Sequence, residues 1–531
     1  MTTDQDFDYD YLVIGSGFGG SVSALRLVEK GWKVGIVEQG KRIGKKEISA
    51  AREAPRKLYW LPAFGLKGFF GYSIFRHLFI IKGVGVGGGS LVWGSVMLEP
   101  KPSFYDDENM KKMGVDWQKE LAPHFATVKN MFAVEKNPRL TEMDHYLKDA
   151  ASLMGAEATF GPVPNAIYFG EPGVAHSDPY FMGEGPERTG CQFCSGCMTG
   201  CPYGSKNSLD YNYLYFAEKK GVNILSETEV KRIQPRVGGG YQLTLATPQQ
   251  KQQLVTSKNV VLSAGVIGTL KLLFRSRDRY GSLPRISQTL GACVRTNSES
   301  ITAVLHKPTA DLSDGTGISS DFYPDSNTHI TQNRFVKNFS SMRFLMAPSV
   351  NGENPRQRAV KTLIQFVTQF PTVAQNLFAR NWEKRVTIMT VMQDLDNQLR
   401  IAYRRRWWWP FSKVLVSEPV PGKAAPSYIK AANKAAESVA KVSDGKPLNN
   451  ILESIFGISV TAHVLSGCPM GDSAADSVLN TNHEVHQYPG LFVVDGSSIP
   501  ANIGVNPSMT IAAMAERFAD KQPSKITPMP R

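Results

Sequence analysis

The chain has 531 residues, of which 42% are hydrophobic and 20% charged, and its formal net charge at pH 7 is +13. This length exceeds what one compact core usually supports, and the composition is that of a globular protein, so we expect two or more domains. The sequence has no run of about 18 apolar residues and no helix-turn-helix, zinc-finger or RNP-type pattern. These absences argue against a membrane-spanning helix and against a nucleic-acid partner.

The N-terminus and the cysteines bear on location. The segment "MTTDQDFDYDYLVIG" lacks the basic and then apolar stretch of a signal peptide. Only six cysteines occur, and four of them fall within eleven residues, unlike the dispersed disulfide framework of a secreted chain. We therefore expect a cytoplasmic protein in a reducing compartment, with no export signal of its own.

The first predicted elements form a nucleotide-binding unit. Residues 10–40, "DYLVIGSGFGGSVSALRLVEKGWKVGIVEQG", read as a strand, a glycine turn, a helix and a second strand that ends at Glu38. Three glycines in this turn let a phosphate approach the backbone, and an acidic residue about 20 positions later binds a ribose hydroxyl. The pattern predicts a dinucleotide site.

Two glycine- and aromatic-rich segments follow. Residues 57–83, "KLYWLPAFGLKGFFGYSIFRHLFIIKG", show no clean period, and we expect a loop or a pair of helices that lines an apolar cavity or touches a membrane, with ordinary core as the alternative. Residues 83–100 hold six glycines, which allow backbone N–H groups to approach a phosphate or ring system.

The remaining elements extend this unit and add another. Residues 205–233 predict a helix and a strand, and residues 259–276 predict a buried strand, a glycine turn and a helix. Residues 301–455 lack such glycines and predict a separate α+β region. Near the C-terminus, a strand at 491–494 precedes a helix opened by Asn506 and Pro507, whose N-terminus suits an anionic or electron-accepting group.

A cysteine segment, "CQFCSGCMTGCPYG", interrupts this series at residues 191–204. Its C-x2-C-x2-C-x3-C-P spacing is that of a ferredoxin cluster loop, and the predicted metal ligands are Cys191, Cys194, Cys197 and Cys201. A zinc site is a second interpretation, although zinc ribbons usually separate two cysteine pairs further. Free thiols or local disulfides that stiffen the loop are the third.

Five blocks together resemble a known family. They are "GSGFGG…VEQG", "GVGVGGGSLVWG", "VVLSAGVIGT", "HVLSGCPMG" and "VVDGSSIPANIGVNPSMTIAAMAER". In this order, from residue 10 to 520, they resemble the glucose-methanol-choline (GMC) oxidoreductases, and most closely the cholesterol-oxidase-like branch. The resemblance implies a Rossmann-like α/β domain that binds FAD without a covalent link, interleaved with an α+β substrate-binding domain.

The resemblance also implies domain boundaries and cofactor contacts. The FAD-binding domain would comprise residues 1–50, 80–100, 205–300 and 456–531, the substrate-binding domain residues 51–79, 101–190 and 301–455, and residues 191–204 would form a cysteine-rich loop between them. The implied FAD contacts are Gly15, Gly17, Phe18 and Gly20 near the pyrophosphate, Glu38 at the ribose, Val230 at the adenine, Gly88, Gly89 and Ser90 on the flavin side, Asp495 and Gly496 at the ribityl and phosphate groups, and Pro507 and Met509 near the flavin ring.

The implied chemistry is oxidation of an alcohol by hydride transfer to flavin N5. His463 stands where the family carries its active-site histidine and would be the base, and Asn506 stands where cholesterol oxidases have asparagine and would orient the substrate oxygen. The substrate would be a sterol, a steroid or another bulky hydrophobic alcohol. Trp93 replaces an asparagine of cholesterol oxidases, which predicts a more apolar pocket, and the sequence does not reveal the glutamate with which those enzymes isomerise their product.

Two other functions stay open from the sequence. One is a dehydrogenase that passes electrons through a cysteine-ligated iron–sulfur cluster to a partner subunit, with a long-chain or sugar alcohol as its substrate. The other is a flavin-binding electron-transfer subunit without alcohol chemistry.

Basic and aromatic residues suggest a membrane surface. "RRRWWWPF" at Arg404–Phe411 combines arginines for anionic headgroups with tryptophans that favour the interface, and residues 356–382 have helical stretches with apolar faces and basic residues. We expect peripheral contact with the inner face of an anionic membrane, although a face that packs on a partner subunit has similar composition.

Overall fold

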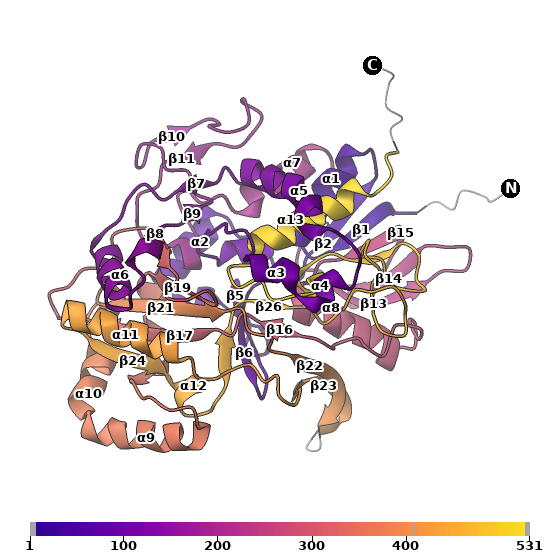
Figure 1. Cartoon of the computed structure of the whole chain (residues 1–531). Helices are drawn as coiled ribbons and strands as arrows, with labels where there is room; N and C mark the ends of the chain where they lie inside the picture. Colours follow the sequence, from indigo (N-terminus) through magenta and orange to yellow (C-terminus); the bar gives the residue numbers. More distant parts are fainter. Residues whose placement is uncertain (1–6, 407–408, 526–531) are drawn as a thin grey trace.

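The first sheet contains the nucleotide-binding unit that the glycine motif predicts. The computed structural model describes residues 7–406 and 409–525 of the chain. The strand order is β12-β2-β1-β15-β14-β13, with β27 paired to β15, and the contacts of β1 with β2 and β15 are parallel (Figure 1). Parallel strands present their carboxyl ends at one edge, which is where such sheets bind ligands. The elements are β1 Tyr9–Ile14, α1 Phe18–Glu29, β2 Val34–Val37, β12 Asn223–Leu225, β13 Glu229–Pro235, β14 Tyr241–Ala246, β15 Gln253–Leu262 and β27 Leu491–Val493.

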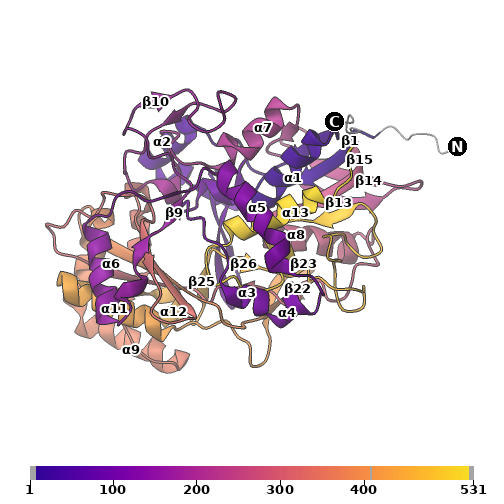
Figure 2. The ribbon, with the colours of Figure 1, turned by 45° about the horizontal axis from the view of Figure 1, so that its top comes forward.

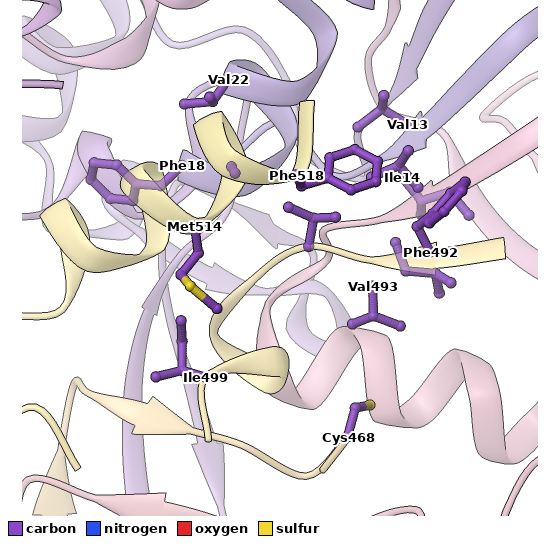
Figure 3. Packing of buried hydrophobic residues seen from close by; sticks show 14 of the residues in the cluster. Val13, Ile14, Phe18, Val22, Cys468, Phe492, Val493, Ile499, Met514 and Phe518 are labelled. Carbon is purple, nitrogen blue, oxygen red and sulfur yellow. The ribbon is translucent and has the colours of Figure 1, made fainter. Parts of the chain in front are cut away.

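Helix α13 (Ser508–Asp520) packs against α1 and against α5 (Trp117–Met131) over this sheet. Met514 and Phe518 of α13 lie among side chains of β1 and β27 in the main hydrophobic core (Figure 3). Because this core joins residues near both ends of the chain, the N-terminal motif and the C-terminal segment form one structural unit.

A second, seven-stranded sheet is antiparallel and has the order β20-β24-β17-β21-β19-β18-β8. Its residues alternate between two faces: Met389 of β21 packs in a core with α6 and α11, whereas Ile388 and Thr390 face a cavity. The elements are β8 Gly161–Pro162, β17 Ser300–Leu305, β18 Ser320–Phe322, β19 Thr328–Asn333, β20 Met346–Pro348, β21 Val386–Gln393, β24 Lys446–Asn450, α6 Glu142–Leu153 and α11 Lys430–Ser443.

The expectation of a loop or helix pair at residues 57–83 is wrong. This segment forms short strands of a five-stranded sheet with the order β25-β6-β5-β3-β4. The pattern shows no period because the strands are short and β6 pairs with β25, which lies more than 370 residues later in the chain. The strands are β3 Tyr59–Leu61, β4 Leu66–Lys67, β5 Phe70–Ile74, β6 Leu78–Gly83 and β25 Ser459–Thr461.

The other elements connect these sheets. The remaining helices are α2 Lys45–Glu53, α3 Pro102–Asp106, α4 Glu108–Lys111, α7 Tyr213–Lys219, α8 Gly265–Phe274, α9 Pro355–Thr368, α10 Phe370–Phe378 and α12 Ile451–Ser454. The remaining strands are β7 Glu135–Lys136, β9 Pro164–Asn165, β10 Ala175–His176, β11 Arg188–Thr189, β16 Arg295–Thr296, β22 Leu399–Arg406, β23 Trp409–Pro419 and β26 Val464–Leu465. Within residues 7–406 and 409–525, no helix has both the length and the apolar content needed to span a bilayer.

The two large sheets confirm the predicted fold class, a doubly wound α/β unit combined with an α+β unit (Figure 2). In Figures 1 and 2, helices of both ends of the chain cover the first sheet, and α6, α9 and α11 lie around the second. The residue ranges given above for the two domains stay a prediction.

Candidate active site

A cavity of about 440 Å³ is lined by residues of both large sheets. One part of its wall is made of glycines and of residues at the edge of the parallel sheet, and another part is apolar. Most of the predicted cofactor contacts line it, namely Gly15, Gly17, Phe18, Glu38, Gly88, Gly89, Val230, Asp495, Gly496 and Pro507. His463 and Asn506 line the same cavity.

The glycine wall has the geometry that a dinucleotide requires. Gly88 has φ +51°, and a Cβ there would come within 2.7 Å of the Gly17 Cα, so two glycine segments touch through bare backbone. A Cβ at Gly17 would meet no atom within 4 Å and would instead fill open space. Gly17 also precedes α1, whose N-terminus has no side-chain cap, so its first N–H groups are available to an anion. These features fit a pyrophosphate of the implied FAD.

Two buried carboxyl groups belong to this wall. The Glu38 carboxylate accepts hydrogen bonds from Ser16 N (3.2 Å), Ser16 Oγ (2.9 Å) and Gly40 N (2.9 Å). The Asp495 carboxylate accepts from Thr269 Oγ1 at 2.6 Å and from Ser497 N at 2.8 Å. Burial raises the pKa of each carboxyl above its ordinary value. Both are therefore held in fixed orientations beside the cavity.

Three predicted cofactor contacts do not line the cavity. A Cβ at Gly20 would lie 2.0 Å from Gly15 O, so this glycine serves the close packing of α1 on its preceding turn. The Ser90 hydroxyl donates to Gly87 O at 2.7 Å and accepts from Leu209 N at 3.1 Å. Met509 is fully buried in the main core. The helix itself starts at Ser508, so Pro507 and Ser508 line the cavity while the Met509 side chain packs inward.

His463 is oriented from both sides of its ring. Its Nδ1 forms a short hydrogen bond with Glu299 Oε1, and because a carboxylate only accepts, Nδ1 carries the proton. The Nε2 lone pair is then left toward Asn506, whose Nδ2 lies 3.4 Å away. The Asn506 Oδ1 is buried without a hydrogen-bond partner in the described residues. Asn506 Nδ2 is thus the donor to Nε2, and a hydroxyl group that enters between them would find an acceptor in Nε2 and a donor in Nδ2.

Glu299 contacts His463, and the sequence did not reveal this neighbour. Its side chain is 2% exposed, and its second oxygen, Oε2, accepts from Ala462 N at 2.9 Å. It precedes His463 by 164 residues and stands at the start of β17, in "TNSES", where no spacing or motif marks it. Only the packing of the antiparallel sheet on the His463 segment brings the two together.

The wall beyond His463 is apolar. It includes Phe70, Ile301, Ile318, Phe335, Phe339 and Met342. Trp93 also lines the cavity, with its ring 5.0 Å from Phe18 in an edge-to-face contact, and its Nε1 is buried without a partner in the described part of the chain. These side chains suit a large hydrophobic group, and Thr331, Asn333 and Thr390 add polar atoms to the same lining.

The predicted metal ligands do not assemble. In the described residues, no group of three or more His, Cys, Asp or Glu side chains is placed to hold a metal ion, and all six cysteines are free thiols. The sulfur atoms have separate protein partners instead: Cys191 Sγ accepts from Phe193 N (3.4 Å) and Cys197 Sγ from Gly317 N (3.3 Å). The described residues therefore give no support to the metal interpretations.

The basic tryptophan cluster is only partly described: Arg404–Arg406 end β22, and β23 begins at Trp409. Trp407 and Trp408 are outside the described residues, so the membrane contact predicted there is untested. Arg404, at its start, forms an ion pair with Glu418 of the opposite strand.

Comparisons with known proteins agree with the site. Two family models described as GMC oxidoreductase match residues 186–286 and 380–515. A cholesterol oxidase from Acinetobacter baumannii is 39% identical, over 99% of this chain and 96% of its own length. A cholesterol oxidase from Mycobacterium tuberculosis strain H37Rv is 38% identical, over 98% of this chain and 92% of its own. Among solved structures, pyridoxine 4-oxidase from Mesorbium loti has the same fold, with a TM-score of 0.62 at 15% identity, over 96% of this chain and 98% of that one.

These similarities confirm the resemblance found in the sequence blocks. They extend over nearly the whole chain, and the family models cover both the segment after the cysteines and the segment with His463 and Asn506. The chain belongs to the GMC oxidoreductase family and is an FAD-dependent oxidoreductase that acts on CH–OH donors.

Proposed function

We propose that this enzyme oxidises the hydroxyl group of a sterol, or of a similarly bulky hydrophobic alcohol, to a carbonyl group. The observation that carries the proposal is the set of His463, Asn506 and Glu299 at a cavity whose wall changes from glycine-lined to apolar. A hydroxyl placed at His463 has space for a cofactor on one side and an apolar wall on the other. The relatives named cholesterol oxidases support the same substrate class.

The side chains divide the work on the hydroxyl group. His463 Nε2 accepts the hydroxyl proton as the carbon–oxygen double bond forms. Asn506 Nδ2, which lies 3.4 Å from Nε2, would turn to donate a hydrogen bond to the same oxygen. Glu299 holds the Nδ1 proton of His463 and stabilises the positive charge of the imidazolium that results. FAD, when bound, accepts the hydride of the carbinol carbon, which completes a two-electron oxidation.

Residues of the glycine wall would hold this FAD. Gly15, Gly17 and the uncapped start of α1 would receive the pyrophosphate, and Glu38 would face the ribose and Val230 the adenine. The further residues assigned to FAD at the cavity are Phe18, Gly88, Gly89, Asp495, Gly496 and Pro507.

We propose molecular oxygen as the final electron acceptor. The relatives carry the name oxidase. A cluster route would need cysteines that converge on one metal site, and the described residues contain no such group. The competing dehydrogenase predicts turnover with an artificial electron acceptor but little peroxide. Peroxide formed in equal amount to the carbonyl product in air would support the oxygen route and exclude an obligatory cluster.

The test of the substrate class uses the purified FAD-containing protein. Cholesterol dispersed in cyclodextrin, dodecanol and glucose are compared as substrates by carbonyl product and by flavin bleaching without oxygen. We expect oxidation of cholesterol with kcat/KM at least about 10²-fold above that of glucose, because a desolvated apolar wall leaves sugar hydroxyls unpaired. No turnover of any of the three alcohols would instead favour a flavin subunit without alcohol chemistry, and turnover that His463→Ala leaves unchanged would exclude His463 as the base.

A further inference from the structure

Helix α9 presents its apolar side to solvent and its polar side to the protein. Val360, Leu363, Ile364 and Val367 follow the i, i+3, i+4, i+7 spacing of one helix face, and they are 57%, 56%, 55% and 78% exposed. On the inner face, Arg358 and Thr362 are buried at 2% and 0% exposure. A surface helix normally has the opposite arrangement, with its apolar stripe in the core.

This orientation is fixed by polar contacts. The Arg358 guanidinium donates to Gly352 O (2.8 Å), to Ser427 Oγ (2.8 Å) and to Glu453 O (3.0 Å). Asn354 caps the start of the helix by accepting from Arg356 N at 3.0 Å. The buried arginine therefore holds the apolar side outward in the folded protein.

The exposed apolar surface continues into α10. Phe370 and Phe378 are 64% and 81% exposed, and together with the four residues of α9 they define the α9–α10 apolar face. In Figures 1 and 2, α9 lies at the lower margin of the molecule and no other element covers its outer side. Large apolar side chains gathered on one exposed face mark an interaction surface.

The charge around this face selects its partner. Between Glu353 and Glu383 the chain contains no Asp or Glu, and Arg356, Lys361 and Arg380 are exposed in this stretch. Apolar side chains flanked by cations are the pattern of a helix that lies in the headgroup region of an anionic bilayer. A protein partner would need acidic residues around an apolar groove, for which this chain gives no further indication.

Helix α10 is connected to the candidate active site through one short element. Helix α10 packs on the 3₁₀ helix Lys337–Leu345, where Asn376 Nδ2 donates to Arg343 O at 2.9 Å. Within that 3₁₀ helix, Phe339 and Met342 line the cavity of His463, whereas Phe344 is 64% exposed. One short element thus packs on α10, which carries part of the apolar face, and also lines the substrate cavity.

We propose that the α9–α10 apolar face docks this enzyme on an anionic lipid bilayer, beside the wall through which a membrane-borne substrate enters the cavity. The substrate part of this proposal rests on the proposed function. The lipid-binding part does not, because it depends only on the exposed face and its cations.

The experiment measures binding of the FAD-loaded enzyme to sedimentable vesicles. The vesicles are phosphatidylcholine alone and phosphatidylcholine with about 30 mol% phosphatidylglycerol. The test variant is Leu363→Glu/Val367→Glu. The matched control is Leu254→Glu/Val237→Glu, at 59% and 99% exposed positions in β15 and between β13 and β14, strands that lie on the right in Figure 1, away from α9. Both variants alter exposed side chains, so folding and bound FAD are expected to be retained, and both are checked by circular dichroism and flavin absorbance.

We expect the wild-type enzyme and the control to bind anionic vesicles more tightly than neutral ones, and the test variant to bind at least about tenfold more weakly. Equal vesicle binding by the test variant, or no binding by the wild type, would overturn the proposal. A wild-type dimer that the test variant dissociates, with vesicle binding unchanged, would assign the face to a second copy of the chain and also overturn it.

A second readout separates this proposal from the proposed function. Oxidation of cholesterol is measured in anionic vesicles and in cyclodextrin. The test variant is expected to lose about tenfold in rate with vesicles and to match the wild type in cyclodextrin. Equal rates of the wild type and the test variant on vesicles would contradict docking. No oxidation of cholesterol in either medium would contradict the proposed function. In that case the vesicle-binding measurement alone would decide whether the α9–α10 apolar face binds lipid.

Discussion

Replacing Glu299 by glutamine tests whether this residue positions His463. The Glu299 carboxylate accepts from two donors, Ala462 N–H and His463 Nδ1–H, with one oxygen each. Glutamine offers only one acceptor oxygen for these two donors. If that oxygen keeps the backbone N–H, the amide NH₂ faces Nδ1 and favours the tautomer with its proton on Nε2, which then cannot accept the substrate proton.

The size of the effect follows from the step that is lost. Proton transfer to a positioned base contributes about 10² to 10⁴ in rate. The kcat of Glu299→Gln is therefore expected to fall by about 10² to 10⁴, or about 2.7 to 5.4 kcal/mol of transition-state stabilisation. KM is expected to change little, because the apolar wall that binds the substrate is untouched. Steady-state oxidation of cholesterol by protein with measured FAD content gives both constants.

Glu453→Gln is the matched control for this change. Glu453 is also a buried glutamate with two protein donors, Ser300 Oγ at 2.6 Å and Ile301 N at 3.0 Å, and it does not contact His463. Burial raises the pKa of Glu453 to about 8, so its carboxyl group is largely protonated at pH 7 and glutamine resembles it closely. We expect kcat within about threefold of wild type for this control. A Glu299→Gln enzyme with equally high kcat, or a loss that follows missing FAD, would refute the reasoning.

Three further predictions concern stability, the cofactor and the substrate oxygen. Burial raises the pKa of Glu453 from 4.5 to about 8 in the folded state, so its contribution to stability is complete below pH 4.5 and declines as the pH rises toward 8. Glu453→Gln should therefore remove a slope of up to about 1.4 kcal/mol per pH unit from the free energy of unfolding measured in urea. An unaltered slope between pH 5.5 and 7.5 would contradict this. Gly88→Ala should lose bound FAD, because its Cβ would lie 2.7 Å from the Gly17 Cα. The control Gly281→Ala has a similar positive φ but open space around it and should retain FAD. The flavin absorbance per protein measures both. Asn506→Leu should lower kcat/KM for cholesterol by at least about tenfold with FAD retained, since one donor to the substrate oxygen is removed; an unchanged value would exclude that role.

The nucleotide-binding wall could be predicted from the sequence because its determinants are local. The strand, the glycine turn, α1 and Glu38 all fall within 31 residues. Over so short a stretch, the spacing of the glycines and of the acidic residue is enough to indicate the site. Ser90 and Met509 show the limit of the same reasoning, since a motif names the residues near a ligand but not which side chains face it. Their side chains pack inward because the neighbouring backbone, rather than the side chain, lines the cavity.

The determinants that the sequence could not give are tertiary. Glu299 is recognised only when β17 packs beside the His463 segment, and the strands at 57–83 only when β25 is paired with β6. For α9 the sequence indicates a helix with an apolar face but not its direction. Its buried side is decided by Arg358, whose partners Ser427 and Glu453 lie far along the chain.

The same buried arginine makes the α9–α10 apolar face a preformed surface rather than one that turns outward on binding. Arg358 donates to the Glu453 carbonyl, and the Glu453 carboxyl group in turn accepts from Ser300 and Ile301, the residues that follow Glu299. Turning the apolar side of α9 inward would leave the guanidinium and these carbonyl groups without partners, which is costly in a buried site. We therefore expect the helix to keep one orientation with and without a bilayer, so that docking would require no rearrangement of α9 or of the start of β17, next to Glu299.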